Sequence, residues 1–105
     1  MNKELIEKVS AMREDLISLT QVTDVKKLAD LVKQKTPVIW PNYLKLIPYM
    51  TVEQQSRANC GWVSLEGLTN VYLERGEDHL TDAVTRFVPQ MIADLDAIAK
   101  KLEQG

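Results

Sequence analysis

Residues 80–102 read LTDAVTRFVPQMIADLDAIAKKL and carry the strongest structural pattern in this chain of 105 residues. Their apolar side chains recur at intervals of three or four, which places them on one side of an α-helix. This stripe consists of Leu80, Val84, Phe87, Met91, Leu95, Ile98 and Leu102. Alanines and further aliphatic residues widen it to about half of the helix circumference. The pattern predicts a long helix over residues 78–102 that packs against more than one neighbour.

A proline interrupts this predicted helix at position 89. Proline lacks an amide hydrogen, and its ring clashes with the carbonyl group four residues earlier, which here belongs to Thr85. We therefore expect a kink or a break in the C-terminal helix at Pro89.

Two further helices are predicted in the N-terminal third of the chain. Residues 3–20 are amphipathic, with an apolar stripe made by Leu5, Val9, Met12, Leu16 and Leu19. A shorter helix follows, with Thr23 or Asp24 as its N-cap. Pro37 disfavours helical geometry at Thr36, so we expect the helix to end there. Because the turn between the two helices is short, they are expected to pack antiparallel.

Residues 37–50, PVIWPNYLKLIPYM, contain three prolines and only one charged side chain, Lys45. The prolines predict an apolar connector with a short helix that begins at Pro41. Two interpretations of this connector stay open. It either seals the core across the helix ends, or keeps part of its surface exposed for a partner, since Trp and Tyr are frequent at interface hot spots.

Residues 52–75 are predicted to form two short helices. Thr51 and Gln54 fit a capping box before a helix over 52–59. Gly61 indicates a turn, a second helix is expected over 63–75, and Gly76 is suited to end it. A helix–turn–helix in this region would make a DNA-binding regulator the alternative function. However, its second helix offers acidic residues to the bases, and the net charge of −2 argues against a nucleic-acid partner.

Taken together, these patterns predict an all-α protein: one domain over 1–105, a small helical bundle with a Pro-rich apolar connector and a long, Pro-kinked C-terminal helix. The only cysteine, Cys60, excludes an intramolecular disulfide and suits a reducing compartment, so the cytoplasm is the expected location. We expect no contact with a membrane, because no segment is apolar for long enough to cross a bilayer.

Few residues are candidates for chemistry. His79 and Asp82 have a spacing that suits a shared metal ion, and Cys60 with His79 would be the only possible thiol–imidazole pair. Acidic residues near a helix start have a simpler explanation, since they favour the positive end of the helix dipole. A metal- or thiol-dependent enzyme is thus the weaker alternative, and we expect no enzymatic activity, no metal and no cofactor.

The chain has more apolar surface than a small monomer readily buries, and this surplus predicts association. We expect a non-enzymatic protein that acts by protein–protein interaction, as an adaptor, inhibitor or accessory factor, and that forms a homodimer. The predicted interface residues are Trp40, Tyr43, Tyr49, Phe87, Met91, Leu95 and Ile98.

Overall fold

The computed structural model describes residues 2–104. Within this range the chain forms four α-helices and no β-strand. The helices are α1 (Lys3–Thr20), α2 (Val25–Leu46), α3 (Val52–Arg75) and α4 (Leu80–Gln104), and a 3-10 helix, η1 (Ile47–Tyr49), directly follows α2. The predicted all-α class is therefore confirmed.

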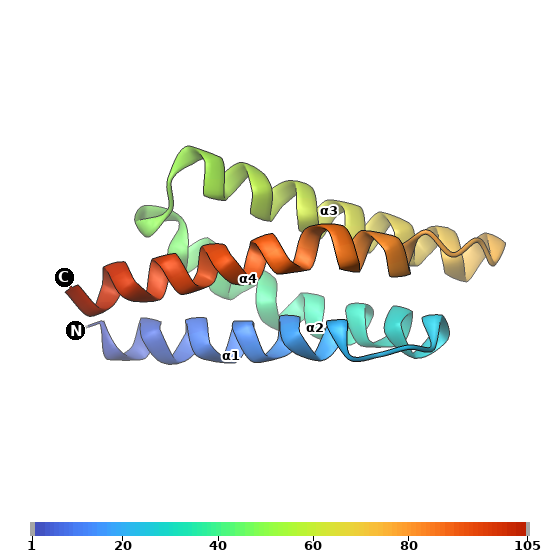
Figure 1. Cartoon of the computed structure of the whole chain (residues 1–105), viewed down its shortest axis with the longest axis horizontal. Coiled ribbons are helices and arrows are strands. Elements are labelled where there is room, and N and C mark those ends of the chain that lie inside the picture. The colour runs from blue at the N-terminus through green and yellow to red at the C-terminus, as the bar shows by residue number, and fades with distance from the viewer. Residues whose placement is uncertain (1, 105) are drawn as a thin grey trace.

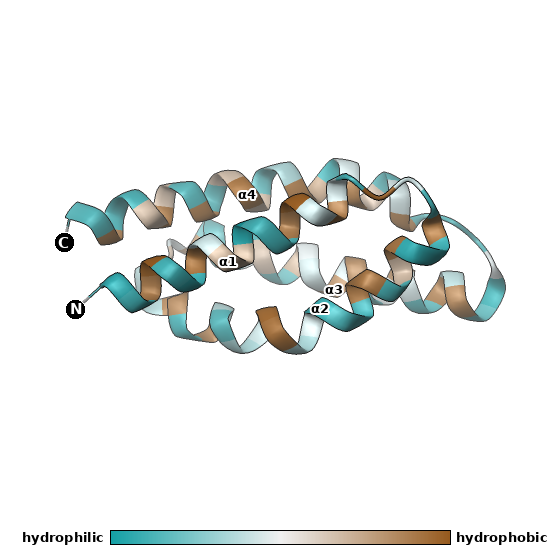
Figure 2. Cartoon of the chain, turned by 90° about the horizontal axis from the view of Figure 1, so that it is seen from below, coloured by the Kyte–Doolittle hydropathy of each residue, from teal (hydrophilic) through white to brown (hydrophobic). Residues whose placement is uncertain are grey.

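Successive helices run in opposite directions, so both termini lie at the same end of an elongated bundle (Figure 1). α1 and α3 each contact both α2 and α4, which closes a ring of four helices around one core. The bundle measures 46 × 22 × 20 Å. Figure 2 shows apolar and hydrophilic segments alternating along each helix, as expected for helices that bury one side.

The core is built from the stripes that the sequence indicates on α1 and α4. The α1 side chains that it buries are Val9, Met12, Leu16 and Leu19. From α4 it takes all members of the predicted stripe except Phe87, which is half-buried. Leu80 and Leu95 have no exposed surface. One copy of the chain thus closes its own hydrophobic core.

Pro89 lies inside α4 without ending it, because the helix is continuous from Leu80 to Gln104. The expectation of a break is wrong, and a kink stays a prediction. Burial offsets the lost backbone hydrogen bond, since the neighbouring side chains of Val88 and Met91 are 0% and 2% exposed.

The predicted end of the second helix at Thr36 is wrong in the same way. α2 continues through Pro37 and Pro41 as far as Leu46, so Pro41 does not begin a new helix. Ile39 and Leu46 are fully buried along this continuation, and that packing compensates for the two prolines. The expected connector is thereby reduced to η1 and the residues that lead into α3.

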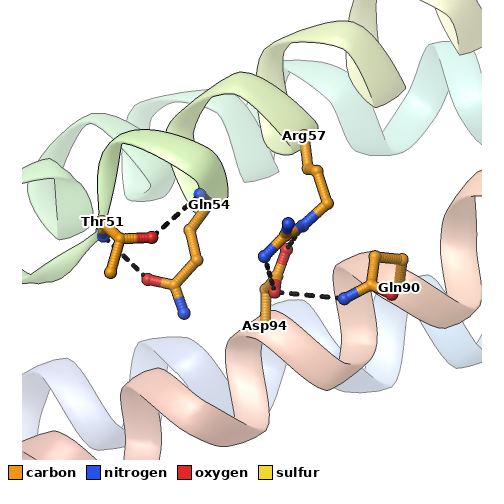
Figure 3. A network of polar contacts seen from close by, with 5 residues as sticks. All are labelled: Thr51, Gln54, Arg57, Gln90 and Asp94. Carbon is orange, nitrogen blue, oxygen red and sulfur yellow. Dashed lines mark hydrogen bonds and ion pairs between the residues drawn. The ribbon is translucent and has the colours of Figure 1, made fainter.

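α3 is also one continuous helix, whereas the sequence predicts two helices with a turn at Gly61. Glycine serves here for close packing, because a Cβ atom at Gly61 would lie 2.6 Å from Sδ of Met91 on α4. The capping box that starts α3 is confirmed: the Thr51 hydroxyl accepts from the Gln54 amide at 3.1 Å, and the Gln54 side chain accepts from the Thr51 amide at 2.9 Å (Figure 3). Gly76, with φ of 72°, ends the helix.

Candidate interaction surface

The residues predicted as an interface divide into two groups. Tyr43, Met91, Leu95 and Ile98 are at most 4% exposed and belong to the core of the single chain. Trp40, Tyr49 and Phe87 are half-buried and pack against the outside of that core. The second group alone has surface left for another molecule in this conformation.

A second apolar stripe runs along the outer side of the second half of α2 and continues into η1. We call it the α2 outer face, and it consists of Pro37, Pro41 and Leu44, the half-buried Trp40 at its edge, and Ile47 of η1. Leu44 and Ile47 are 54% and 41% exposed, and the neighbouring Val38 is 58% exposed. Lys45 is the only charged residue between Thr36 and Val52. Such a concentration of exposed apolar side chains is typical of interaction sites.

The α2 outer face borders a small pocket between α2 and the start of α3. Trp40, Leu44 and Ile47 line one side, and Gln55 and Asn59 are among the α3 residues on the other. The pocket volume is about 30 Å³, which holds one or two water molecules. It contains no charged side chain. The pocket has room for the tip of one apolar side chain.

Three aromatic rings connect this surface to the core. Trp40 and Tyr43 have ring centroids 6.3 Å apart, and Tyr43 meets Trp62 edge-on at 6.2 Å. Burial of the Tyr43 hydroxyl raises its pKa to about 12, because the charged phenolate is disfavoured away from water. The buried Trp62 indole N–H reaches no hydrogen-bond partner among the described residues. The three rings therefore connect Trp40 of the α2 outer face to Trp62 in the core.

A polar network joins α3 to α4 on another side of the bundle (Figure 3). Nε and Nη2 of Arg57 each donate to the Asp94 carboxylate at 2.8 Å, and Gln90 adds a weaker contact of 3.4 Å. Asp94 is only 7% exposed. Its carboxylate raises the pKa of the Arg57 guanidinium through these hydrogen bonds.

The candidate chemical residues do not come together. Cys60 lies beside Phe87 and Met91, whereas His79 precedes Phe87 by eight residues, or about 12 Å along a helix. Asp78 accepts a hydrogen bond from the Thr81 amide at 3.1 Å near the start of α4. Within residues 2–104, no group of three potential metal ligands converges on a point. Asp78 thus has an observed structural role at the start of α4.

The structural basis for a helix–turn–helix is missing, because residues 52–75 form one continuous helix without the turn. The second, recognition helix that such a motif needs is therefore not a separate element.

Leu44, Ile47 and Val38 are exposed residues that the predicted interface leaves out. For Leu44 and Ile47 a signal exists, since positions 37, 40, 41, 44 and 47 follow helical spacing. Val38 lies outside this spacing. The signal is hidden by the assumption that Pro37 ends the helix. Once α2 continues, its second half is apolar on two opposite sides.

Comparisons with known proteins give no match: no protein-family model, no curated protein and no solved structure is significantly similar to this chain. Among the helices of residues 2–104, none combines the length and the apolar character needed to cross a bilayer.

Proposed function

We propose that this chain is a non-enzymatic helical-bundle protein that works by protein–protein contact and self-associates through the α2 outer face. The supporting observation is the exposure of Leu44 and Ile47, at 54% and 41%, in a segment with a single charge. Removing such side chains from water contributes about 25 cal/mol per Å² of apolar area. The role that follows is that of an adaptor, inhibitor or accessory factor.

A second copy is the proposed occupant because the face is compatible with itself. In a twofold dimer the same patch meets itself, so a charged patch would place like charges opposite one another. The α2 outer face avoids this, since its members carry no charge and Lys45 lies about 100° around the helix from Leu44. The core is complete within one copy, so we expect folded monomers to associate. Cys60, a free thiol, supports a reducing compartment such as the cytoplasm as the location.

The test is the solution mass by size-exclusion chromatography with light scattering, across a range of protein concentrations. We expect a monomer–dimer equilibrium for the wild type and a shift to monomer for Leu44→Glu. Circular dichroism checks that the variant keeps its helix content, which is expected because Leu44 is exposed.

Leu73→Glu is the matched control, since Leu73 is 45% exposed on α3. It lies 18 residues after Gln55, which borders the α2 outer face, and so about 27 Å along the helix from it. Leu73→Glu should leave the dimer intact. A wild type that is monomeric at every concentration, or an equal effect of both variants, would contradict self-association through α2.

A further inference from the structure

We propose that the groove between α3 and α4 binds a small amphipathic anion. Its carboxylate or phosphate group would lie between Arg57 and Arg86, and its apolar body would cover Phe87. This site lies on a different side of α3 from the α2 outer face, so it does not depend on the proposed association.

The groove has the size of a small-molecule site. Its volume is about 390 Å³, within the range of roughly 300–1,000 Å³ found for such sites. α3 contributes Ser56, Arg57 and Cys60, and α4 contributes Arg86, Phe87, Gln90 and Met91. The lining therefore combines an apolar base with polar side chains that are able to donate hydrogen bonds.

The groove offers guanidinium groups rather than a net positive charge. Two arginines line it, and none of the described residues that line it is a carboxylate. Each arginine pairs with a carboxylate beside the groove, Arg57 with Asp94 and Arg86 with Asp82. An anionic ligand would therefore be recognised by hydrogen bonds from the guanidinium groups, whose geometry matches carboxylate and phosphate oxygens.

Arg57 is held in place for such a ligand by Asp94. The buried carboxylate takes the Nε hydrogen and one Nη2 hydrogen, each over 2.8 Å. A guanidinium has five N–H groups, so three remain. The Arg57 side chain as a whole is 43% exposed. Asp94 thus fixes the orientation of Arg57 without blocking the groove.

Arg86 is free to turn toward a ligand. Its partner is Asp82, one helical turn away at 3.4 Å, and the two side chains are 69% and 76% exposed. Exposed pairs of this kind contribute little to stability. Exchanging Asp82 for a ligand anion therefore costs little, and Arg groups match both carboxylate and phosphate oxygens.

Phe87 and Met91 give the groove an apolar lining, which favours a ligand with an apolar body. Phe87 is half-buried, and Met91, only 2% exposed, closes the groove from below. A purely inorganic anion would leave this apolar surface in contact with water. Fatty carboxylates and alkyl phosphates share the chemistry that fits, and the test separates them.

Cys60 gives a readout at the site itself. It is the only cysteine of the chain, it is exposed, and it lines the groove. We would measure its alkylation rate by iodoacetamide with increasing octanoate, octyl phosphate or octylammonium. Saturable protection by at least one of the two anions is expected, and the anion that protects better identifies the head group.

Arg86→Gln is the decisive variant, because it removes a groove charge and leaves the Arg57–Asp94 pair intact. It should weaken anion binding roughly tenfold or more, the loss expected for one charge-assisted hydrogen bond. Arg75→Gln, 18 residues or about 27 Å along α3 from Arg57, is the control and should bind normally.

Three results would overturn the proposal: no saturable protection by either anion, equal protection by octylammonium, or unchanged affinity in Arg86→Gln. The solution mass of Arg86→Gln should equal that of the wild type, since Arg86 is remote from the α2 outer face. A failed anion test therefore does not count against the proposed self-association. Likewise, a protein that stays monomeric does not count against anion binding in the groove.

Discussion

Arg57 on α3 and Asp94 on α4 form a two-bond ion pair in which the acid is buried and the base is half-exposed. The pair is the main polar connection between these two helices. The Asp94 carboxylate makes little contact with water, and Arg57 supplies two of the three side-chain hydrogen bonds that it accepts.

Asp94→Asn is expected to destabilise the fold. The amide keeps the shape of the side chain but loses the charge-assisted hydrogen bonds, at a cost on the order of 2 kcal/mol. Urea unfolding followed by circular dichroism measures the change. Asp82→Asn, at an exposed ion pair, is the control and should change stability by less than about 0.5 kcal/mol. Equal effects of the two substitutions would mean that burial of Asp94 adds nothing.

The two glycines inside α3 should respond in opposite ways to alanine. Nothing lies within 4 Å of a Cβ atom at Gly67, so Gly67→Ala gains helix propensity and should stabilise by about 0.5–1 kcal/mol. At Gly61 the new methyl group meets Sδ of Met91, and the overpacking should cost about 1–3 kcal/mol. Thermal unfolding of both variants checks this order.

Met91→Ala combined with Gly61→Ala provides a check on the cause. If the clash is responsible, the alanine at position 61 should be less harmful once the Met91 side chain is gone. An unchanged effect of Gly61→Ala in that background would assign it to another contact.

Stability should fall in the alkaline range because of Tyr43. Its pKa is about 12 in the fold against an ordinary value of 10.0. Between these values the unfolded chain loses the tyrosine proton and the folded chain keeps it, so ionisation favours unfolding. The stabilisation is complete below pH 10 and is lost as the pH rises through 12, by on the order of 2–3 kcal/mol.

Urea unfolding at several pH values between 9 and 12 measures this loss, and Tyr43→Phe removes the titrating group. The variant should show a smaller decrease with pH than the wild type, while other groups contribute equally to both. Parallel pH profiles would show that Tyr43 ionises as easily in the fold as outside it.

Leu95 and Leu44 should separate the core from the surface. Leu95 is 0% exposed, so Leu95→Ala should cost about 2–5 kcal/mol, and Leu95→Lys should unfold the chain. Leu44, at 54% exposed, should change the free energy of unfolding by less than about 0.5 kcal/mol when replaced by alanine. If the Leu95→Lys protein folds but no longer self-associates, Leu95 belongs to an interface between copies and not to the core.

The sequence by itself determines the helical class, the α1 and α4 stripes and several helix ends. These features depend on neighbours within a few residues: the apolar spacing of Leu5, Val9 and Met12, the capping box of Thr51 and Gln54, and the left-handed conformation that Gly76 permits. Local rules are sufficient there because the interacting groups are close along the chain.

Only the tertiary structure shows that Pro37, Pro41, Pro89 and Gly61 lie inside helices. Each residue disfavours a helix locally, yet each lies inside one, since burial of Ile39, Leu46 and Val88 and the close contact of Gly61 with Met91 outweigh the local cost. The same packing places Leu95 in the core and leaves Leu44 outside. Helical spacing gives two apolar sides for α2, and only the position of the other three helices determines which side stays exposed.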